Sequence, residues 1–349
     1  MDLRSFVPPR CPRSSCRNHL SPRPDFYARH GSYRVLCRDH AIPRFRCKDC
    51  RKRFGYQTFR QDYRDQRPDL NAQVFERYTG GQSLRRIGKE LDIDIHAVQK
   101  KFRKLGRHAG HLHRNLLTAL PSGRTFLLDE LETHEGTLIA TLTVPILIEK
   151  QSGLVVGTNV GTIRRLSRKG SRRRRLQERH EAEHGRRVDE SRRVVLAEFE
   201  RLKQLLSGRS ATLRTDEKKL YASLVRRLFG GQVEHLRTPG RAERSTFNPL
   251  FPINHTLARY RDLSARLHRR SWCASKKREY LGLHLQMVTV YRNYVCRRTN
   301  VEAAHRTPAW HLGLLPRQLG YREVCSWRQD WGGISPHPLS VSGRRVVAA

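Results

Sequence analysis

Residues 125–132 read Thr-Phe-Leu-Leu-Asp-Glu-Leu-Glu, and residues 211–216 read Ala-Thr-Leu-Arg-Thr-Asp. Each stretch has the composition of a β-strand and carries acids at or near its end. The first predicts a strand with Asp129 close to its tip, and the second predicts a strand that delivers Asp216. What surrounds these two strands indicates the fold.

The neighbouring elements predict an α/β domain. Two further strands, 144–149 and 154–160, form a hairpin around the tetrapeptide Lys-Gln-Ser-Gly that ends at Gly153. Apolar periodicity then predicts helices over 189–206 and 218–228, a strand over 233–237 and a helix from Phe251. The succession β-β-β-α-β-α-β-α is typical of an RNase H-like fold, a mixed five-stranded sheet with flanking helices.

Such a fold brings acids from its first strand, its fourth strand and its last helix together on two divalent ions. Two ions about 4 Å apart clamp the attacking and leaving oxygens of a phosphoryl displacement, and carboxylates hold them. Asp129 and Asp216 occupy the first two places, so we predict that they bind Mg²⁺ or Mn²⁺. The alternative is a solvated strand end or, for Asp216, a helix cap.

The charge of the chain indicates a polyanionic partner. The 349 residues include 70 Lys and Arg against 32 Asp and Glu, a formal net charge of +38. Phosphate contacts by such residues release counterions and give affinity without sequence preference. No apolar run approaches the roughly 18 residues that span a bilayer, so we expect no membrane partner. Because no apolar segment follows Met1, we expect a cytoplasmic protein.

Composition divides the chain into four parts. We predict a zinc-ribbon DNA-binding region over 1–67 and a helix-turn-helix DNA-binding domain over 68–113. The RNase H-like catalytic domain is predicted over 123–298, with a basic insertion at 164–187. The remainder, 299–349, is predicted to be a C-terminal tail whose last residues, 340–349, have the composition of a disordered segment.

Four cysteines in two short pairs predict a structural zinc site. Cys11 and Cys16 form the first pair, and Cys47 and Cys50 form the second, which follows an aromatic and basic strand at 44–46. Four thiolates suit tetrahedral zinc, which can fold a segment too small to build its own core. Unliganded cysteines are the alternative; Cys37 and His40 in the intervening loop could also replace a ligand, although that would leave one pair unused.

Residues 83–105 predict a helix-turn-helix. Apolar spacing indicates a helix capped by Ser83, a tight turn at 92–94 and a second helix from Ile95, with Gly88 where the two helices cross. We also expect an earlier helix over 69–78. The exposed side of the last helix is predicted to contact DNA in the major groove, through His96, Gln99, Lys100, Arg103 and Lys104. A helical hairpin with a solvated basic face is the alternative.

The insertion at 164–187 contains four consecutive arginines, Arg172, Arg173, Arg174 and Arg175. Its simplest interpretation is a flexible, solvated basic loop. In a DNA-cutting enzyme these arginines would in addition hold phosphate backbone, which positions DNA without specifying its sequence. Trp272 is interpreted as a core residue, with base stacking as the alternative.

From Cys11 to about Trp331 the chain resembles the DDE-type transposases of bacterial insertion sequences, especially the group with an N-terminal zinc ribbon and helix-turn-helix. The matching stretches are Arg-Phe-Arg-Cys-Lys-Asp-Cys at 44–50 with Arg-Lys-Arg-Phe after it, Leu-Asp-Glu at 128–130, Thr-Asp at 215–216, Arg-x4-Arg-Leu-x-Arg at 261–269, Thr-Pro-Ala at 307–309 and Gly-Leu at 313–314. The resemblance implies that Asp129 and Asp216 are metal-binding acids, in preference to Glu130 and Glu132.

The third acid of the family is expected seven residues before a basic residue, here Arg261, and that position holds Asn254. Seven residues turn a helix by about 700°, so Asn254 and Arg261 share a face. Asn can bind a hard cation through its carbonyl oxygen, but it adds no negative charge and cannot act as a base. Relatives in this group are similar in sometimes carrying Asn followed by a basic residue. Glu243, in a predicted loop, is a poorer substitute.

The resemblance therefore implies a transposase. The front end would recognise terminal inverted repeats, and the metal-binding domain would hydrolyse a phosphodiester and then join the freed 3′-hydroxyl to target DNA. Because two ends must be processed together, we expect a dimer or larger assembly on DNA. The rival hypotheses are an inactive DNA-binding remnant and an RNase H-like nuclease that cuts without joining.

Overall fold

The computed structural model describes residues 6–37, 40–243, 245–264, 266–267, 273–299 and 305–327. Its centre is a mixed six-stranded sheet with the order β6-β5-β4-β8-β9, in which a two-residue strand, β7, also pairs with β5. The strands are β4 (Arg124–His134), β5 (Thr141–Glu149), β6 (Val155–Thr158), β7 (Gly161–Thr162), β8 (Ala211–Asp216) and β9 (Val233–Thr238). β5 is antiparallel to its neighbours, whereas β4, β8 and β9 are parallel. All five predicted strands are confirmed.

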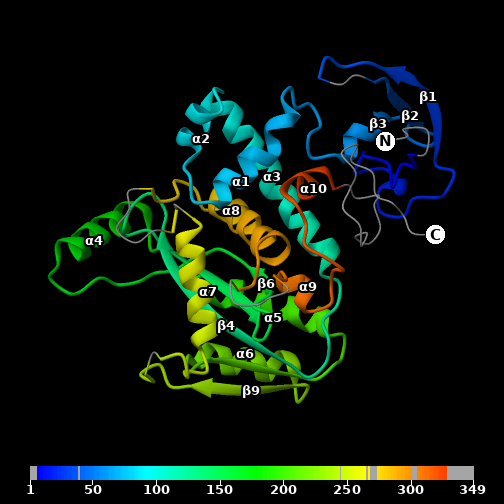
Figure 1. Ribbon diagram of the computed structural model, residues 1–349. Helices are drawn as coiled ribbons and strands as arrows, with labels where there is room; N and C mark the ends of the chain where they lie inside the picture. Colours follow the sequence, from blue (N-terminus) through cyan, green and yellow to red (C-terminus); the bar gives the residue numbers. More distant parts are fainter. Residues whose placement is uncertain are drawn as a thin grey trace.

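Helices cover both faces of this sheet. They are α5 (Ser191–Leu206), α6 (Lys219–Phe229), α7 (Phe251–Asp262) and α8 (Arg278–Val290), which continues into a π-helical turn, Tyr291–Val295. Side chains alternate along β4, so Leu128 packs with α5 and α6 and Leu127 packs with α7 and α8. Figure 1 shows α7, in yellow, crossing β4, which it contacts. The chain is thus α/β with a mixed sheet, an arrangement consistent with the predicted RNase H-like fold.

The predicted helix-turn-helix is present. Its helices are α1 (Asn71–Thr79), α2 (Leu84–Glu90) and α3 (Ile95–Leu116), preceded by a short 3-10 turn, Pro68–Leu70. Ser83 caps α2 by accepting a hydrogen bond from the Arg86 N–H, and Asp94 caps α3 in the same way. A Cβ added to Gly88 would lie 3.0 Å from the Ile93 carbonyl oxygen. Glycine is therefore needed where α2 meets the turn, as predicted.

One long helix joins the helix-turn-helix to the sheet. α3 packs along α8, and a Cβ at Gly106 would stand 2.7 Å from the Leu283 Cβ. Further along, the His113 Nε2 lies 3.0 Å from the Val156 carbonyl oxygen of β6. The buried side chains of α1, α2, α3, α5 and α6 form one continuous hydrophobic core. The helix-turn-helix is therefore built onto the α/β domain.

The C-terminal residues that the structure describes belong to the same core. Residues 305–327, assigned from the sequence to a tail, form α9 (Pro308–His311) and α10 (Tyr321–Ser326). α10 packs against α1 and α3, where the His108 Nε2 lies 2.6 Å from the Val324 carbonyl oxygen. Residues 340–349 and Trp272 lie outside the described residues.

The N-terminal region has a small sheet and an aromatic core of its own. Its strands are β1 (Tyr27–Tyr33), β2 (Ile42–Cys47) and β3 (Arg53–Gly55), paired antiparallel, with 3-10 turns at Arg17–His19 and Tyr56–Phe59. Its buried residues include Phe6, Phe26, Phe45 and Tyr56 together with three of the four paired cysteines. We call this unit, residues 6–60 as far as described, the cysteine module.

The basic insertion differs from its predicted form. We expected a flexible loop, but residues 172–184 form a helix, α4 (Arg172–His184), that projects from the body at the left of Figure 1. The Ser171 hydroxyl caps it by accepting from the Arg174 N–H, and Arg174 pairs with Glu178 one turn later. Local caps and charge pairs thus order a segment with little apolar periodicity. Among the described helices, none is both long enough and apolar enough to cross a bilayer.

Candidate functional site

The strand register brings the two predicted aspartates together. β4 and β8 run parallel, and their last paired residues are Leu127 and Arg214. Asp129 and Asp216 each lie two residues beyond this pair, so they stand at the same level and on the same face of adjacent strands. This face is covered by α7. Leu127 and Leu131, each two residues from Asp129 in β4 and therefore on the same face, belong to the hydrophobic cluster that includes the buried residues of α7. The predicted convergence of the first two acids is supported by this register.

Electrostatics agrees with the register. The pKa of Asp129 is raised to about 6, mainly by burial and in addition by the negative charges of Asp216 and Glu130. The Glu130 N–H, 2.7 Å from Asp129 Oδ1, and the ammonium of Lys218 act in the opposite direction. The raised pKa means that the ionised Asp129 carboxylate has too little positive charge around it. A bound cation would supply that charge.

Asp216 combines a local structural role with a free oxygen for a ligand. Its Oδ1 accepts a hydrogen bond of 3.0 Å from the Lys218 N–H, two residues ahead at the start of α6. This contact closes the turn between β8 and α6, whereas the N-cap residue of α6 is Lys218, so Asp216 is not the helix cap of the alternative interpretation. A carboxylate has two oxygens, so this contact and cation binding are compatible.

Glu130 points to the opposite face and already has several partners. Its Oε1 accepts from the Tyr221 hydroxyl at 2.7 Å and contacts the Lys218 ammonium, and its Oε2 accepts from Thr143 at 2.5 Å. Glu132 pairs with Arg165. The hydrogen-bonded Glu130 network was not predicted, although the alternation of β4 could have placed it across the sheet from Asp129. Both glutamates thus have partners that a metal ion would have to displace.

The third predicted position lies on the helix that covers this face. Asn254 is exposed in the first turn of α7, and Arg261 is half-buried near its end. The buried side chains of α7 include Ile253, Leu257 and Tyr260, and the helix packs against β4 and β5. Within the described residues, the Asn254 side chain makes no hydrogen bond to either aspartate. Glu243 is exposed in the loop before α7.

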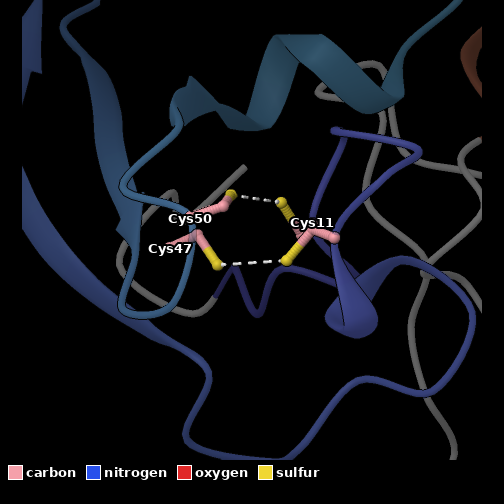
Figure 2. A group of neighbouring side chains, drawn as sticks. Cys11, Cys47 and Cys50 are labelled. Atoms are coloured by element: carbon pink, nitrogen blue, oxygen red, sulfur yellow. Dashed lines mark hydrogen bonds between the residues drawn. The ribbon is translucent and has the colours of Figure 1, made fainter.

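The four cysteines form a compact cluster. The Sγ atoms of Cys11 and Cys50 are 3.5 Å apart, those of Cys16 and Cys47 are 3.8 Å apart, and all four lie within 4.8 Å of one another. Figure 2 shows Cys11 facing Cys47 and Cys50 from a separate loop. Thiolates about 2.3 Å from a tetrahedral zinc would stand about 3.8 Å apart. The predicted ligand set fits one zinc ion.

Hydrogen bonds behind the cluster favour thiolates. The buried Asn18 amide lies 3.9 Å from the Sγ atoms of both Cys16 and Cys47, and it is held by Asp49. Burial opposes the charged form of Cys50, but the Lys52 N–H and the three other cysteines lower the pKa of Cys50 to about 7, whereas burial raises the pKa of its neighbour Cys11. Such outer contacts orient metal ligands. Asn18 was not predicted; its position two residues after Cys16 is the one signal that the sequence offers.

Cys37 and His40 lie away from this cluster. The Cys37 thiol is exposed and donates to the Asp65 carbonyl oxygen, and the His40 Nε2 lies 3.1 Å from the Tyr56 hydroxyl. Within the described part of the chain, the four cysteines are the only group of three or more Cys, His, Asp or Glu side chains placed to share an ion. In these residues no third His, Cys, Asp or Glu side chain is placed to share one ion with Asp129 and Asp216.

The proposed DNA-contacting face of α3 is only partly exposed. His96, Lys100 and Arg103 are exposed, whereas Gln99 and Lys104 are half-buried. The Lys104 ammonium donates to the Tyr63 carbonyl oxygen, and burial lowers its pKa. Lys104 is thus less accessible than predicted, because residues 61–65 pack against this side of α3. On α4, Arg172, Arg173 and Arg175 are exposed, and Arg174 is engaged by Glu178.

Comparisons with known proteins give limited information. No protein-family model matches the sequence, and no curated protein is significantly similar to it. Among solved structures, the chain is similar to one from a cryo-EM structure of a simian T-cell lymphotropic virus intasome in complex with the PP2A regulatory subunit B56 gamma. The match covers 69% of this chain and 71% of that one, with 13% sequence identity and a TM-score of 0.28. This TM-score is too low to establish a shared fold.

Proposed function

We propose that the protein is a DNA transposase with an RNase H-like catalytic domain. The observation that supports this most is the placement of Asp129 and Asp216 at one level of two adjacent parallel strands, on the face that α7 covers. The net charge of +38 and the helix-turn-helix that packs on the same domain indicate that the partner of this site is DNA.

In this proposal Asp129, Asp216 and the side-chain carbonyl of Asn254 hold Mg²⁺ or Mn²⁺, and Arg261 on α7 orients a phosphate. Bound ions would neutralise the charge that develops on the phosphate and activate the attacking oxygen. The residues fit such ions, because the ionised form of Asp129 lacks positive charge around it. Asn254 would contribute an oxygen ligand without adding charge.

The DNA contacts of the proposal fall into two groups. His96, Gln99, Lys100 and Arg103 would enter the major groove of the terminal repeats, with Lys104 in a lesser role since it is engaged by Tyr63. The arginines of α4 would hold phosphate backbone of the element end or the target. Two bound ends imply a dimer or larger assembly, and the four cysteines would hold a structural zinc ion.

A strand-transfer assay tests this function. The purified protein is incubated with Mg²⁺, a target plasmid and labelled DNA from both flanks of the coding sequence, where element ends would lie. Joined product is the expected result, and Asp129→Ala and Asp216→Ala should abolish it while leaving DNA binding intact. Glu217→Gln, an exposed acid next to Asp216, is the matched control and should retain activity.

The outcomes separate the rival functions. Cleavage without joined product would indicate a nuclease, and binding without cleavage would indicate a DNA-binding remnant. If Asn254→Ala left the rate of strand transfer unchanged, the assignment of Asn254 to the metal site would be wrong, and the assignment of the two aspartates would stand. Equal activity of Asp129→Ala and the unmodified protein would contradict the proposal as a whole.

A further inference from the structure

A stripe of exposed basic residues runs along almost the whole length of α3. His96, Lys100, Arg103, Arg107, His111 and Arg114 are all exposed, at spacings of three or four residues. At 1.5 Å per residue this stripe is about 27 Å long. The major groove is about 12 Å wide, so it can take only part of such a helix. If the first half of α3 enters the groove, as the proposed function has it, the exposed basic residues of the second half would be available to phosphate backbone.

The second half of α3 borders a cavity of about 370 Å³ between this helix and the cysteine module. Arg107 and His111 line it from α3, Arg10 and His19 from the cysteine module, and Phe59 and Trp327 also border it. Its remaining lining residues include Arg60 and Lys104 but no carboxylate. Basic groups from two parts of the chain therefore meet around a space that a small anion can enter.

Two of these arginines are not neutralised. Arg60 is paired with Asp62 through two contacts of 2.9 and 2.8 Å, and Lys104 donates to Tyr63. Among the described residues neither Arg10 nor Arg107 has a carboxylate partner. The pKa of His111 is lowered by burial, by the charge of Arg114 and, across the cavity, by the charge of Arg10. The positive charge of Arg10 is therefore felt on the α3 side of the cavity. Uncompensated arginines facing one space are typical of an anion site.

His111 supplies a neutral donor to the same space. Its Nδ1 accepts a hydrogen bond of 3.1 Å from Arg114, which leaves the proton of the neutral ring on Nε2. The backbone next to Arg10 is fixed, since the Cys11 N–H donates to the Asn18 carbonyl oxygen at 2.8 Å. The site is therefore held by the cysteine cluster on one side and by α3 on the other.

We propose that this cavity binds one phosphate group of the DNA backbone, through Arg10 and Arg107 with His111 beside them. The bound phosphate would flank the groove that the first half of α3 contacts. The inference rests on the proposed function in that it takes DNA as the ligand. It adds a contact that couples the cysteine module to the helix-turn-helix.

Salt-dependent binding of the full-length, zinc-loaded protein to an arbitrary duplex tests the site. Loss of one phosphate contact should reduce the slope of log K against log salt by about 0.9, and reduce affinity about eightfold at 0.1 M salt. Arg10→Ala and Arg107→Ala should each show this loss, and the double variant should show no more than one such loss. Arg226→Ala, an exposed arginine of α6, is the control and should keep the full slope.

A second measurement identifies the phosphate. Single neutral methylphosphonates are placed along the duplex, and one position should weaken binding by the unmodified protein but not by Arg107→Ala. Zinc content and unfolding midpoint verify that each variant is folded. Unchanged slopes in both variants, or a double variant that loses twice the slope, would overturn the shared phosphate site and leave the transposase proposal intact. If the unmodified protein binds no DNA, both proposals fail.

Discussion

Replacing Asp129 with Asn is expected to stabilise the protein in the absence of divalent metal. The folded protein raises the pKa of Asp129 from 3.8 to about 6, mainly through burial. A pKa difference of one corresponds to about 1.4 kcal/mol, so the ionised carboxylate costs about 3 kcal/mol of folding free energy at pH 8. The amide of Asn removes this cost and can still accept the hydrogen bond from the Glu130 N–H.

The sign of the pH dependence follows from the raised pKa. A carboxyl whose pKa is raised on folding favours the folded state below pH 3.8, and this contribution is lost as the pH rises through about 6. The advantage of Asp129→Asn should therefore be about 3 kcal/mol at pH 8 and about half of that at pH 5.

Urea unfolding at pH 5 and pH 8, with and without Mg²⁺, measures these effects. Mg²⁺ should stabilise the unmodified protein more than Asp129→Asn, because the amide offers an uncharged and therefore weaker ligand. Two results would refute the reasoning: an Asn variant less stable than the unmodified protein at pH 8, or equal Mg²⁺ effects on both. Glu217→Gln serves as the control, since Glu217 is exposed.

Three further predictions concern the rest of the structure. Cys47→Ser should lower the zinc content from one ion per chain to near zero and loosen the cysteine module, as measured by metal release and hydrogen exchange; full zinc retention would count against the four-cysteine site. Gly106→Ala should lower the free energy of unfolding by about 1–3 kcal/mol, because the added Cβ would lie 2.7 Å from the Leu283 Cβ. Gly282→Ala, in a helix with open space around the glycine, is the control and should not destabilise the protein. Equal unfolding free energies of the two variants would contradict the close packing at Gly106. Burial raises the pKa of Glu198 from 4.5 to about 8, so the contribution of its protonated carboxyl to stability should be lost progressively as the pH rises from 4.5 to 8. Glu198→Gln should remove this decline between pH 6 and pH 8, and an unaltered pH profile would show that Glu198 is not its source.

Much of the sheet could be predicted from the sequence because its strands are locally distinct. Apolar runs that end in acids indicated β4 and β8, and Lys150–Gly153 indicated the turn between β5 and β6. The meeting of Asp129 and Asp216 was predicted from the succession of elements, since the predicted fold brings acids of its first and fourth strands together; the register that sets them at one level is a property of the structure. The cysteine cluster was predictable for a similar reason, since pair spacing alone defines the ligand set.

Other features depend on partners that are distant in sequence. α4 was missed because it has little apolar periodicity; a serine cap and charge pairs, Arg174 with Glu178 and Arg164 with Glu181, order it instead. The close contact of Gly106 with α8, and the packing of α10 on α1 and α3, join segments about 180 residues or more apart, so no local pattern reveals them. The partial burial of Lys104 likewise results from residues 61–65 lying over α3.

The continuity of α3 has a geometric consequence. Its first turns belong to the helix-turn-helix, its middle is pressed against α8 at Gly106, and its end reaches β6 through His113. Because α3 is held at these three places, the helix-turn-helix has a fixed position relative to the sheet. DNA held along its exposed side would meet the Asp129 edge of the sheet at a set distance and angle. In the proposed transposase, the length and position of α3 would therefore set the number of base pairs between the bound sequence and the cleaved phosphodiester.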